Sequence, residues 1–204
     1  MFVAITGTIG AGKSSVSKLI AKRGFATYDT DKMVHTYYEK EGVLYEPVLQ
    51  LLGRSILNED GSISREKMAP MLFSDKVKLD TLEAMVFKQV KNDLTTLKAE
   101  HFTELVFVEV PLLFESNLDT MFDCIIVVDA PITTRLARLK EKGIAKDDAL
   151  KRMSHQASAE EKRSGADYII DNNHDLAYLE EAVDEVLNLI ALERAKSWIN
   201  PNIQ

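Results

Sequence analysis

The stretch from Gly7 to Ser14, Gly-Thr-Ile-Gly-Ala-Gly-Lys-Ser, constrains the fold more than any other part of the sequence. The apolar run FVAIT precedes it at 2–6, and a segment with helical periodicity follows it at 13–23. Glycines let the backbone turn sharply and aim successive N–H groups inward, and the helix adds the positive end of its dipole. The pattern is typical of α/β proteins that bind a phosphate chain.

The stretch fits G-x-x-x-x-G-K-[ST] at every fixed position, so we predict that the chain binds a nucleoside triphosphate. In such a loop, Lys13 follows the γ-phosphoryl group and the hydroxyl of Ser14 is offered to Mg²⁺. A phosphate loop by itself does not name a reaction. The predicted nucleotide contacts are Gly7, Thr8, Ile9, Gly10, Ala11, Gly12, Lys13, Ser14 and Ser15.

The rest of the sequence alternates short apolar runs with longer helical segments, which predicts an α/β fold with a five-stranded parallel sheet flanked by helices. The expected strands are 2–6, 25–29, 105–110, 124–129 and 168–171. The expected helices are 13–23, 31–41, 75–99, 132–142, 146–156 and 175–197. No strand is expected between 42 and 100, so this stretch is interpreted as a helical insertion that carries substrate specificity.

The composition of the chain excludes several classes of protein. With 204 residues, 46% of them hydrophobic, it suits one compact domain with an inserted subdomain. The formal charge of −7 argues against a general nucleic-acid binder, and no apolar run is long enough to span a bilayer. Cys124 cannot form an internal disulfide and lies in the apolar run CIIVV, as expected of a buried thiol in a cytoplasmic protein.

Two carboxylates, Asp29 and Asp31, stand where the second expected strand gives way to a helix. We expect the end of this strand to lie beside the phosphate loop, at the sheet edge where α/β folds bind ligands. Either both carboxylates cap the helix at 31–41, or one accepts a proton from an acceptor hydroxyl while the other supports Mg²⁺ or orients the first. His35 follows Asp31 by one helical turn, so either a hydrogen bond between them or an ordinary surface contact is expected.

Five segments in order resemble the dephospho-coenzyme A kinase family. They are AITGTIGAGKSSV, YDTDKMVH, LGRSILNEDGSISREKMAPMLFSD, VEVPLLFES and LKRMSHQASAEEKRSGADYIIDNN. The resemblance implies transfer of phosphate from Mg-ATP to the ribose 3′-hydroxyl of dephospho-coenzyme A, the last step of coenzyme A synthesis. It also implies a kinase core at 1–41, 101–131 and 166–204, a coenzyme A subdomain at about 42–100 and a lid at about 132–165.

The resemblance also implies roles for residues outside the phosphate loop. Asp31 corresponds to the base, and Arg138 and Lys142 fall at the lid as catalytic cations. Asn172 belongs with the nucleotide contacts. The implied acceptor contacts are Asp29, Asp31, His35, Arg65, Glu115 and Gln156. ATP and dephospho-coenzyme A are the expected partners, with no nucleic acid or membrane, and the chain is expected to be a monomer or weak homo-oligomer.

The sequence departs from the family pattern at three places. Phe87-Lys88 replaces a His-Pro pair, Lys142 stands where a second lid arginine is usual, and Glu109 replaces the aspartate that ends an apolar strand. A lysine keeps the charge but loses the planar, two-pronged grip on phosphate. Two other interpretations stay open: a kinase for a nucleoside monophosphate or small metabolite, and a nucleotide-dependent binding module.

Overall fold

The computed structural model describes residues 1–199, with side chains up to residue 196. The last residues of the expected core segment, 200–204, lie outside this part. The chain divides into two compact units, which are described separately. The sheet unit contains Met1–Tyr28 and the chain from His101 onward, and the helical unit is Asp29–Glu100. The helical unit therefore begins at the end of the second strand and takes in a helix that the sequence analysis grouped with the core.

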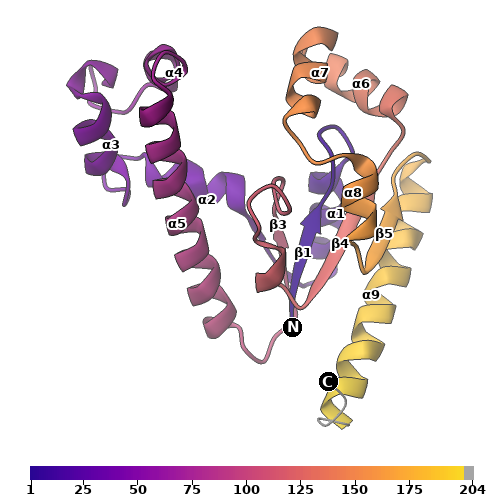
Figure 1. The fold of residues 1–204 in the computed structure, drawn as a ribbon. Coiled ribbons are helices and arrows are strands. Elements are labelled where there is room, and N and C mark those ends of the chain that lie inside the picture. Colours follow the sequence, from indigo (N-terminus) through magenta and orange to yellow (C-terminus); the bar gives the residue numbers. More distant parts are fainter. Residues whose placement is uncertain (200–204) are drawn as a thin grey trace. The chain divides into compact units, whose positions relative to one another are not determined.

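A five-stranded parallel sheet forms the centre of the sheet unit, as predicted (Figure 1). Its strands are β1 (Phe2–Thr6), β2 (Ala26–Asp29), β3 (Val106–Glu109), β4 (Cys124–Asp129) and β5 (Tyr168–Asp171). Their order is β2-β3-β1-β4-β5. Ile5 in β1 pairs with Glu109 on one side and Ile126 on the other.

Strand β3 lies between β1 and β2, so the second strand is not a direct neighbour of the strand that leads into the phosphate loop. The burial of β3 and β2 agrees with the order of the strands in the sheet. All four residues of β3 are buried, as suits a strand with neighbours on both sides, whereas the residues of β2 are half-buried, as suits an edge. Glu109, at the end of β3, is thus an acidic residue on one of the two strands next to β1.

The helices of the sheet unit are α1 (Lys13–Lys22), α6 (Ile132–Glu141), α7 (Lys146–Ser154), α8 (Ala159–Ser164) and α9 (Leu176–Ile199), and a short 3₁₀ turn spans Asp119–Met121. Helices α1 and α9 pack against each other and against the sheet (Figure 1). The core between them takes Val16 and Ile20 from α1, Val183 and Ile190 from α9, and Phe107 from β3. None of the described helices is both long and apolar enough to cross a membrane.

The helical unit contains α2 (Thr30–Tyr37), α3 (Tyr45–Leu52), α4 (Arg65–Phe73) and the long α5 (Lys76–Glu100), with a 3₁₀ turn at Arg54–Ile56. Ser64 caps α4, because its side chain accepts the N–H of Lys67. The hydroxyl of Tyr37 donates to Asp93 at 2.6 Å and so joins α2 to α5. The unit has one isolated antiparallel bridge, Leu57 to Ile63, but no strand.

We predict that Ile190→Ala lowers the free energy of unfolding by about 2–5 kcal/mol, because Ile190 is fully buried and the smaller side chain leaves a cavity. Leu192→Ala is the matched control: it removes a similar side chain from the same helix at a position that is 58% exposed. That change should stay within about 0.5 kcal/mol of the parent. Chemical denaturation measures both, and equal losses would mean that the buried face of α9 is misassigned.

Candidate active site

The phosphate loop connects β1 to α1 at the carboxyl edge of the sheet (Figure 1). Its shape depends on glycines. Gly7 has φ +148°, and a Cβ there would lie 2.2 Å from the carbonyl oxygen of Val128 in the neighbouring β4. Gly12, the residue before α1, has φ +101°. Any larger residue at these two positions would be strained or would collide with backbone, which explains the spacing of the motif.

Lys13 is folded back onto the loop that it follows. Its side-chain Nζ donates to the carbonyl oxygen of Gly7 at 3.0 Å and lies 3.5 Å from that of Thr8. The residue is only 9% exposed. Lys13 therefore concentrates a positive charge within the loop, in a chain whose overall charge is negative.

Two side chains from later parts of the sheet unit donate hydrogen bonds to the carbonyl oxygen of Ala11. Asn172, one residue beyond β5, donates its Nδ2 to this oxygen at 2.7 Å, and Arg138 in α6 donates Nη1 to it at 3.2 Å. Arg138 also donates Nη2 to the carbonyl of Asn172 at 2.8 Å. In a trans peptide the C=O and the next N–H point in opposite directions, so fixing the Ala11 carbonyl also fixes the N–H of Gly12.

The same contact leaves no room for a side chain at Gly12, where a Cβ would lie 2.0 Å from Nδ2 of Asn172. Asn172 and Arg138 thus lie directly against the phosphate loop. Both belong to the catalytic and nucleotide-binding set that the sequence analysis assembled. Both side chains contact backbone atoms of the loop, and contacts of this kind cannot be predicted from the sequence alone.

Helix α6 packs behind the loop. A Cβ on Gly10 would lie 2.9–3.2 Å from backbone and Cβ atoms of Arg135. Arg135 is buried and donates Nε to the carbonyl of Ala130 at 3.0 Å. Burial lowers the pKa of its guanidinium, and the charge of Asp129 opposes this shift. Lys142, the residue after α6, is exposed, and its backbone N–H caps the end of that helix.

The segment between α7 and α8 reaches the loop as well. Gln156 accepts the backbone N–H of Ile9 through its side-chain Oε1 at 2.9 Å. The resemblance implied that Gln156 contacts the acceptor, and the structure places its side-chain oxygen on the phosphate loop. Ser14 and Ser15, at the start of α1, are exposed.

Glu109 lies at the end of β3, where it is only 9% exposed. The hydroxyl of Ser17 in α1 donates to its Oε2 at 3.1 Å. The carboxylate that replaces the expected aspartate is therefore anchored to the helix that follows the phosphate loop. Ser14 lies one turn before Ser17 in that helix.

In the helical unit, the first carboxylate of YDTDKMVH caps a helix. Oδ1 of Asp29 accepts the N–H groups of Asp31 and Lys32 at 3.0 and 3.2 Å. The capping interpretation is thus correct for Asp29. Asp31 lies in the first turn of α2, where a negative charge suits the helix dipole, and it is exposed.

Two further residues of the expected acceptor site meet each other within the helical unit. Nη1 of Arg65 lies 3.1 Å from Nε2 of His35, and the guanidinium lies 5.5 Å from the centre of the Tyr38 ring. A pocket of about 320 Å³ opens beside them. Its lining is apolar apart from Arg65 and the hydroxyl of Tyr38, and includes Val34, Met68, Leu72 and Leu82.

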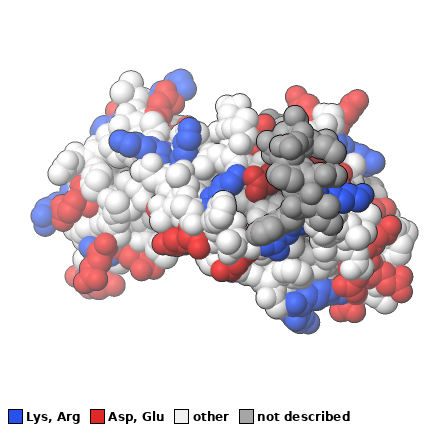
Figure 2. Space-filling model, turned by 90° about the horizontal axis from the view of Figure 1, so that it is seen from below, with Lys and Arg blue, Asp and Glu red and all other residues white. Residues whose placement is uncertain are grey.

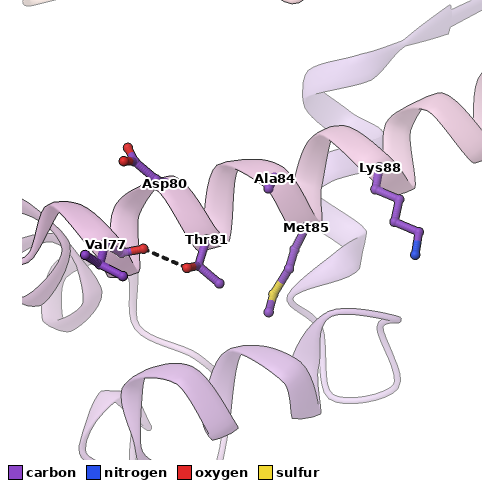
Figure 3. Close-up of a pocket in the computed structure, with 6 residues that line it drawn as sticks. All are labelled: Val77, Asp80, Thr81, Ala84, Met85 and Lys88. Atoms are coloured by element: carbon purple, nitrogen blue, oxygen red, sulfur yellow. Dashed lines mark hydrogen bonds between the residues drawn. The ribbon is translucent and has the colours of Figure 1, made fainter.

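A second hollow, of about 540 Å³, runs along α5 and is lined by Val77, Asp80, Thr81, Ala84, Met85 and Lys88 (Figure 3). The hydroxyl of Thr81 is turned back onto the carbonyl of Val77 at 2.7 Å. Met85 and Lys88 extend from the same side of the helix in Figure 3. Lys88, one of the departures from the family pattern, thus places an ammonium beside an apolar groove.

Charged side chains of both signs are interspersed over the described part of the face in Figure 2. Because the chain has a formal net charge of −7, positive potential at a polyanion site must come from groups at the site itself. In the sheet unit Lys13 and Arg138 are such groups, and in the helical unit Arg65 is one.

One contact in the sheet unit involves a residue that the sequence analysis missed. Lys162 in α8 has a fully buried side chain, and its Nζ lies 2.9 Å from Oε1 of Glu115. The sequence offered no signal for this pair, because Lys162 stands in the polar run AEEKRS and Glu115 lies 47 residues earlier. Glu115, expected at the acceptor, thus has an ionic partner within its own unit.

A family model described as dephospho-CoA kinase matches residues 1–178. The dephospho-CoA kinase of Streptococcus pyogenes serotype M1 is 36% identical over 198 residues, which covers 95% of this chain and 100% of that protein. The dephospho-CoA kinase of Fusobacterium nucleatum is 36% identical over 191 residues, covering 93% of this chain and 98% of that one.

Solved structures share the fold of this chain. TT1252 from Thermus thermophilus has a TM-score of 0.79 at 31% identity, with 92% of this chain and 96% of that chain covered. A shikimate kinase from Acinetobacter baumannii has a TM-score of 0.53 at 16% identity, with 94% and 93% covered, and shares the fold alone. The fold is that of the P-loop kinases. Because the family model and the relatives extend over most of its length, the chain belongs to the dephospho-CoA kinase family.

Proposed function

We propose that the chain transfers the γ-phosphoryl group of ATP to the ribose 3′-hydroxyl of dephospho-coenzyme A, yielding coenzyme A and ADP. The observation that carries this proposal is the braced phosphate loop, with Lys13 inside it, in a chain whose family match includes the helical unit as well as the sheet unit. The helical unit adds an apolar pocket with a cation at its edge, which suits an acceptor with both apolar and phosphorylated parts.

In the donor site, the ammonium of Lys13 and backbone N–H groups of residues 7–14 would hold the phosphate chain of ATP, apart from the N–H of Ile9, which donates to Gln156, and that of Ala11, which donates to Thr8. Lys13 would exchange its contacts with loop carbonyls for phosphate oxygens. Arg138 and Lys142 would neutralise charge on the transferring group and exclude water that would otherwise hydrolyse ATP. Because Lys142 is a lysine, it would act as a point charge without a bidentate grip.

Membership in an ATP-dependent kinase family implies a divalent metal, and we propose Mg²⁺. The residues present fit a metal held mainly by phosphate: within the described part of the chain, no group of three or more His, Cys, Asp or Glu side chains could hold an ion by itself. The exposed hydroxyl of Ser14 and the carboxylate of Glu109 are the protein groups we assign to it. When bound, the ion would offset negative charge on the phosphates.

On the acceptor side, we assign the role of base to Asp31. The 3′-hydroxyl would lose its proton to this carboxylate as its oxygen bonds to the γ-phosphorus and the bond from that phosphorus to ADP breaks. Asp29 would support Asp31 by fixing the first turn of α2. His35 and Arg65, already in contact with each other, would bind phosphate or ribose oxygens of the acceptor. A cytoplasmic location and a monomeric or weakly oligomeric state stay predictions.

The acceptor is tested by offering ATP with dephospho-coenzyme A, AMP, CMP or shikimate in separate reactions and measuring ADP. We expect rapid ADP release with dephospho-coenzyme A and little with the other three or with none, because the helical unit suits a long acceptor. Activity on AMP or shikimate alone would assign the enzyme to another acceptor. Equal ADP release without any acceptor would indicate a nucleotide-dependent binding module.

We predict that Lys13→Ala lowers turnover to about a thousandth of the parent or less, because it removes the charge assigned to the transferring phosphoryl group. Lys18→Ala is the control, since it removes the same charge from an exposed position of the same helix and should leave turnover nearly unchanged. Steady-state kinetics with dephospho-coenzyme A measures both. An active Lys13 variant would show that this loop does not hold the transferring phosphoryl group.

We predict that Asp31→Asn lowers turnover by about 10²–10⁴-fold while ATP affinity stays close to that of the parent, because only proton removal from the acceptor is affected. Glu39→Gln, which removes a carboxylate from an exposed position just beyond α2, serves as the control. Turnover comes from coupled ADP detection and ATP affinity from equilibrium titration without acceptor. Near-normal turnover of the Asp31 variant would leave this residue with a helix-terminal role only.

A further inference from the structure

Lys162 is a charged residue whose side chain is fully buried. Lysine side chains are almost never fully buried unless they are paired, and the Lys162 side chain has no exposed surface. Its Nζ lies 2.9 and 3.1 Å from the two carboxylate oxygens of Glu115 and 3.4 Å from the carbonyl of Pro111. It also lies 5.7 Å from the centre of the Phe114 ring. The ammonium is thus fully enclosed by the loop that follows β3.

Glu115 does more than neutralise Lys162. Its Oε1 also accepts the backbone N–H of Ala157 at 2.7 Å. Burial by itself raises the pKa of the Glu115 carboxyl, but hydrogen bonds from Lys162 and from the backbone outweigh it, so the pKa lies below its ordinary value. The carboxylate therefore stays ionised and anchors the chain at Ala157. Both of its oxygens are engaged inside the sheet unit.

The anchored residue lies next to the contact with the phosphate loop. Gln156 accepts the N–H of Ile9, Ala157 donates to Glu115, and Ser158 begins α8 with a reciprocal cap. In that cap, Ser158 Oγ accepts the N–H of Glu161 and Glu161 Oε2 accepts the N–H of Ser158. Three consecutive residues thus each have a fixed partner, and only the first of the three reaches the phosphate loop.

We propose that the buried Lys162–Glu115 pair is a positioning device for the ATP site: it fixes Ala157, and thereby sets the side chain of Gln156 against the phosphate loop. The inference rests on the proposed function only in taking ATP as the ligand of that loop. It assigns Glu115 and Lys162 to the donor side of the reaction, where they act through Gln156 without touching either substrate.

Two uncharged double variants separate the anchoring contact from the ion pair. Glu115→Gln with Lys162→Met keeps a side-chain oxygen for the Ala157 N–H, and Glu115→Leu with Lys162→Met removes it. Neither leaves a buried charge unpaired, which is the usual cause of large losses when one partner is deleted. Comparing the two variants thus isolates the hydrogen bond to Ala157.

We expect the Leu/Met variant to bind ATP about tenfold more weakly than the Gln/Met variant, the effect of about one hydrogen bond. Equilibrium titration of ATP without acceptor measures this, so the result does not depend on the acceptor being dephospho-coenzyme A. A separate titration of dephospho-coenzyme A should give the same dissociation constant for both variants. Equal ATP affinities, or a loss confined to the acceptor, would overturn the proposal.

A second comparison tests the route through Gln156. Gln156→Met alone should weaken ATP binding by about the same factor, and adding it to the Leu/Met variant should cause little further loss, since both changes break one path. Additive losses would overturn the inference, as would parent-like affinity of the Gln156 variant. If the Leu/Met protein does not fold, Glu115→Asp should weaken ATP binding relative to the parent, because its shorter side chain withdraws the carboxylate from Ala157 without deleting either charge.

Discussion

The hydrogen bonds that converge on the carbonyl of Ala11 are the constraint on which the nucleotide site depends. Asn172, just beyond β5, and Arg138, in α6, both donate to this one oxygen. A planar trans peptide then fixes the direction of the next N–H, so two distant segments set the orientation of the backbone at Gly12 in the phosphate loop. Gly12 has to be glycine because Asn172 occupies the place where a Cβ would lie.

The sheet unit holds the donor loop at several points in the same manner. Arg135 packs behind Gly10, Gln156 accepts the N–H of Ile9, and Lys13 bonds to carbonyls within the loop. The loop is therefore preorganised, which reduces the conformational entropy lost when a phosphate chain binds. In the helical unit, by contrast, His35, Arg65 and the pocket beside them depend on packing among α2, α4 and α5. The groups assigned to ATP are thus held by the sheet unit, and His35 and Arg65, assigned to the acceptor, are held by the helical unit.

Much of the fold could be predicted because its signals are local. The runs FVAIT and CIIVVD became β1 and β4 with the expected bounds. Asp29 caps α2, one of the two alternatives open for it. The order of the strands could not be predicted in the same way. Strand β3 lies beside β1 although the helical insertion separates them in sequence, and its complete burial agrees with its place inside the sheet.

Glycine spacing, apolar periodicity and ordered motifs are properties of neighbouring residues, so they were enough to predict the phosphate loop, the five strands and the family. They also predicted helices α1, α2, α5, α6, α7 and α9, but not the short helices α3, α4 and α8 as separate elements. The contacts of the functional side chains became visible in the folded chain alone. The fold paired Lys162 with Glu115, Gln156 with the N–H of Ile9, and Arg65 with His35. Burial and hydrogen bonding depend on which distant segments the fold brings together. A lysine in a polar run gives no sign that packing will enclose it and force it to find a carboxylate.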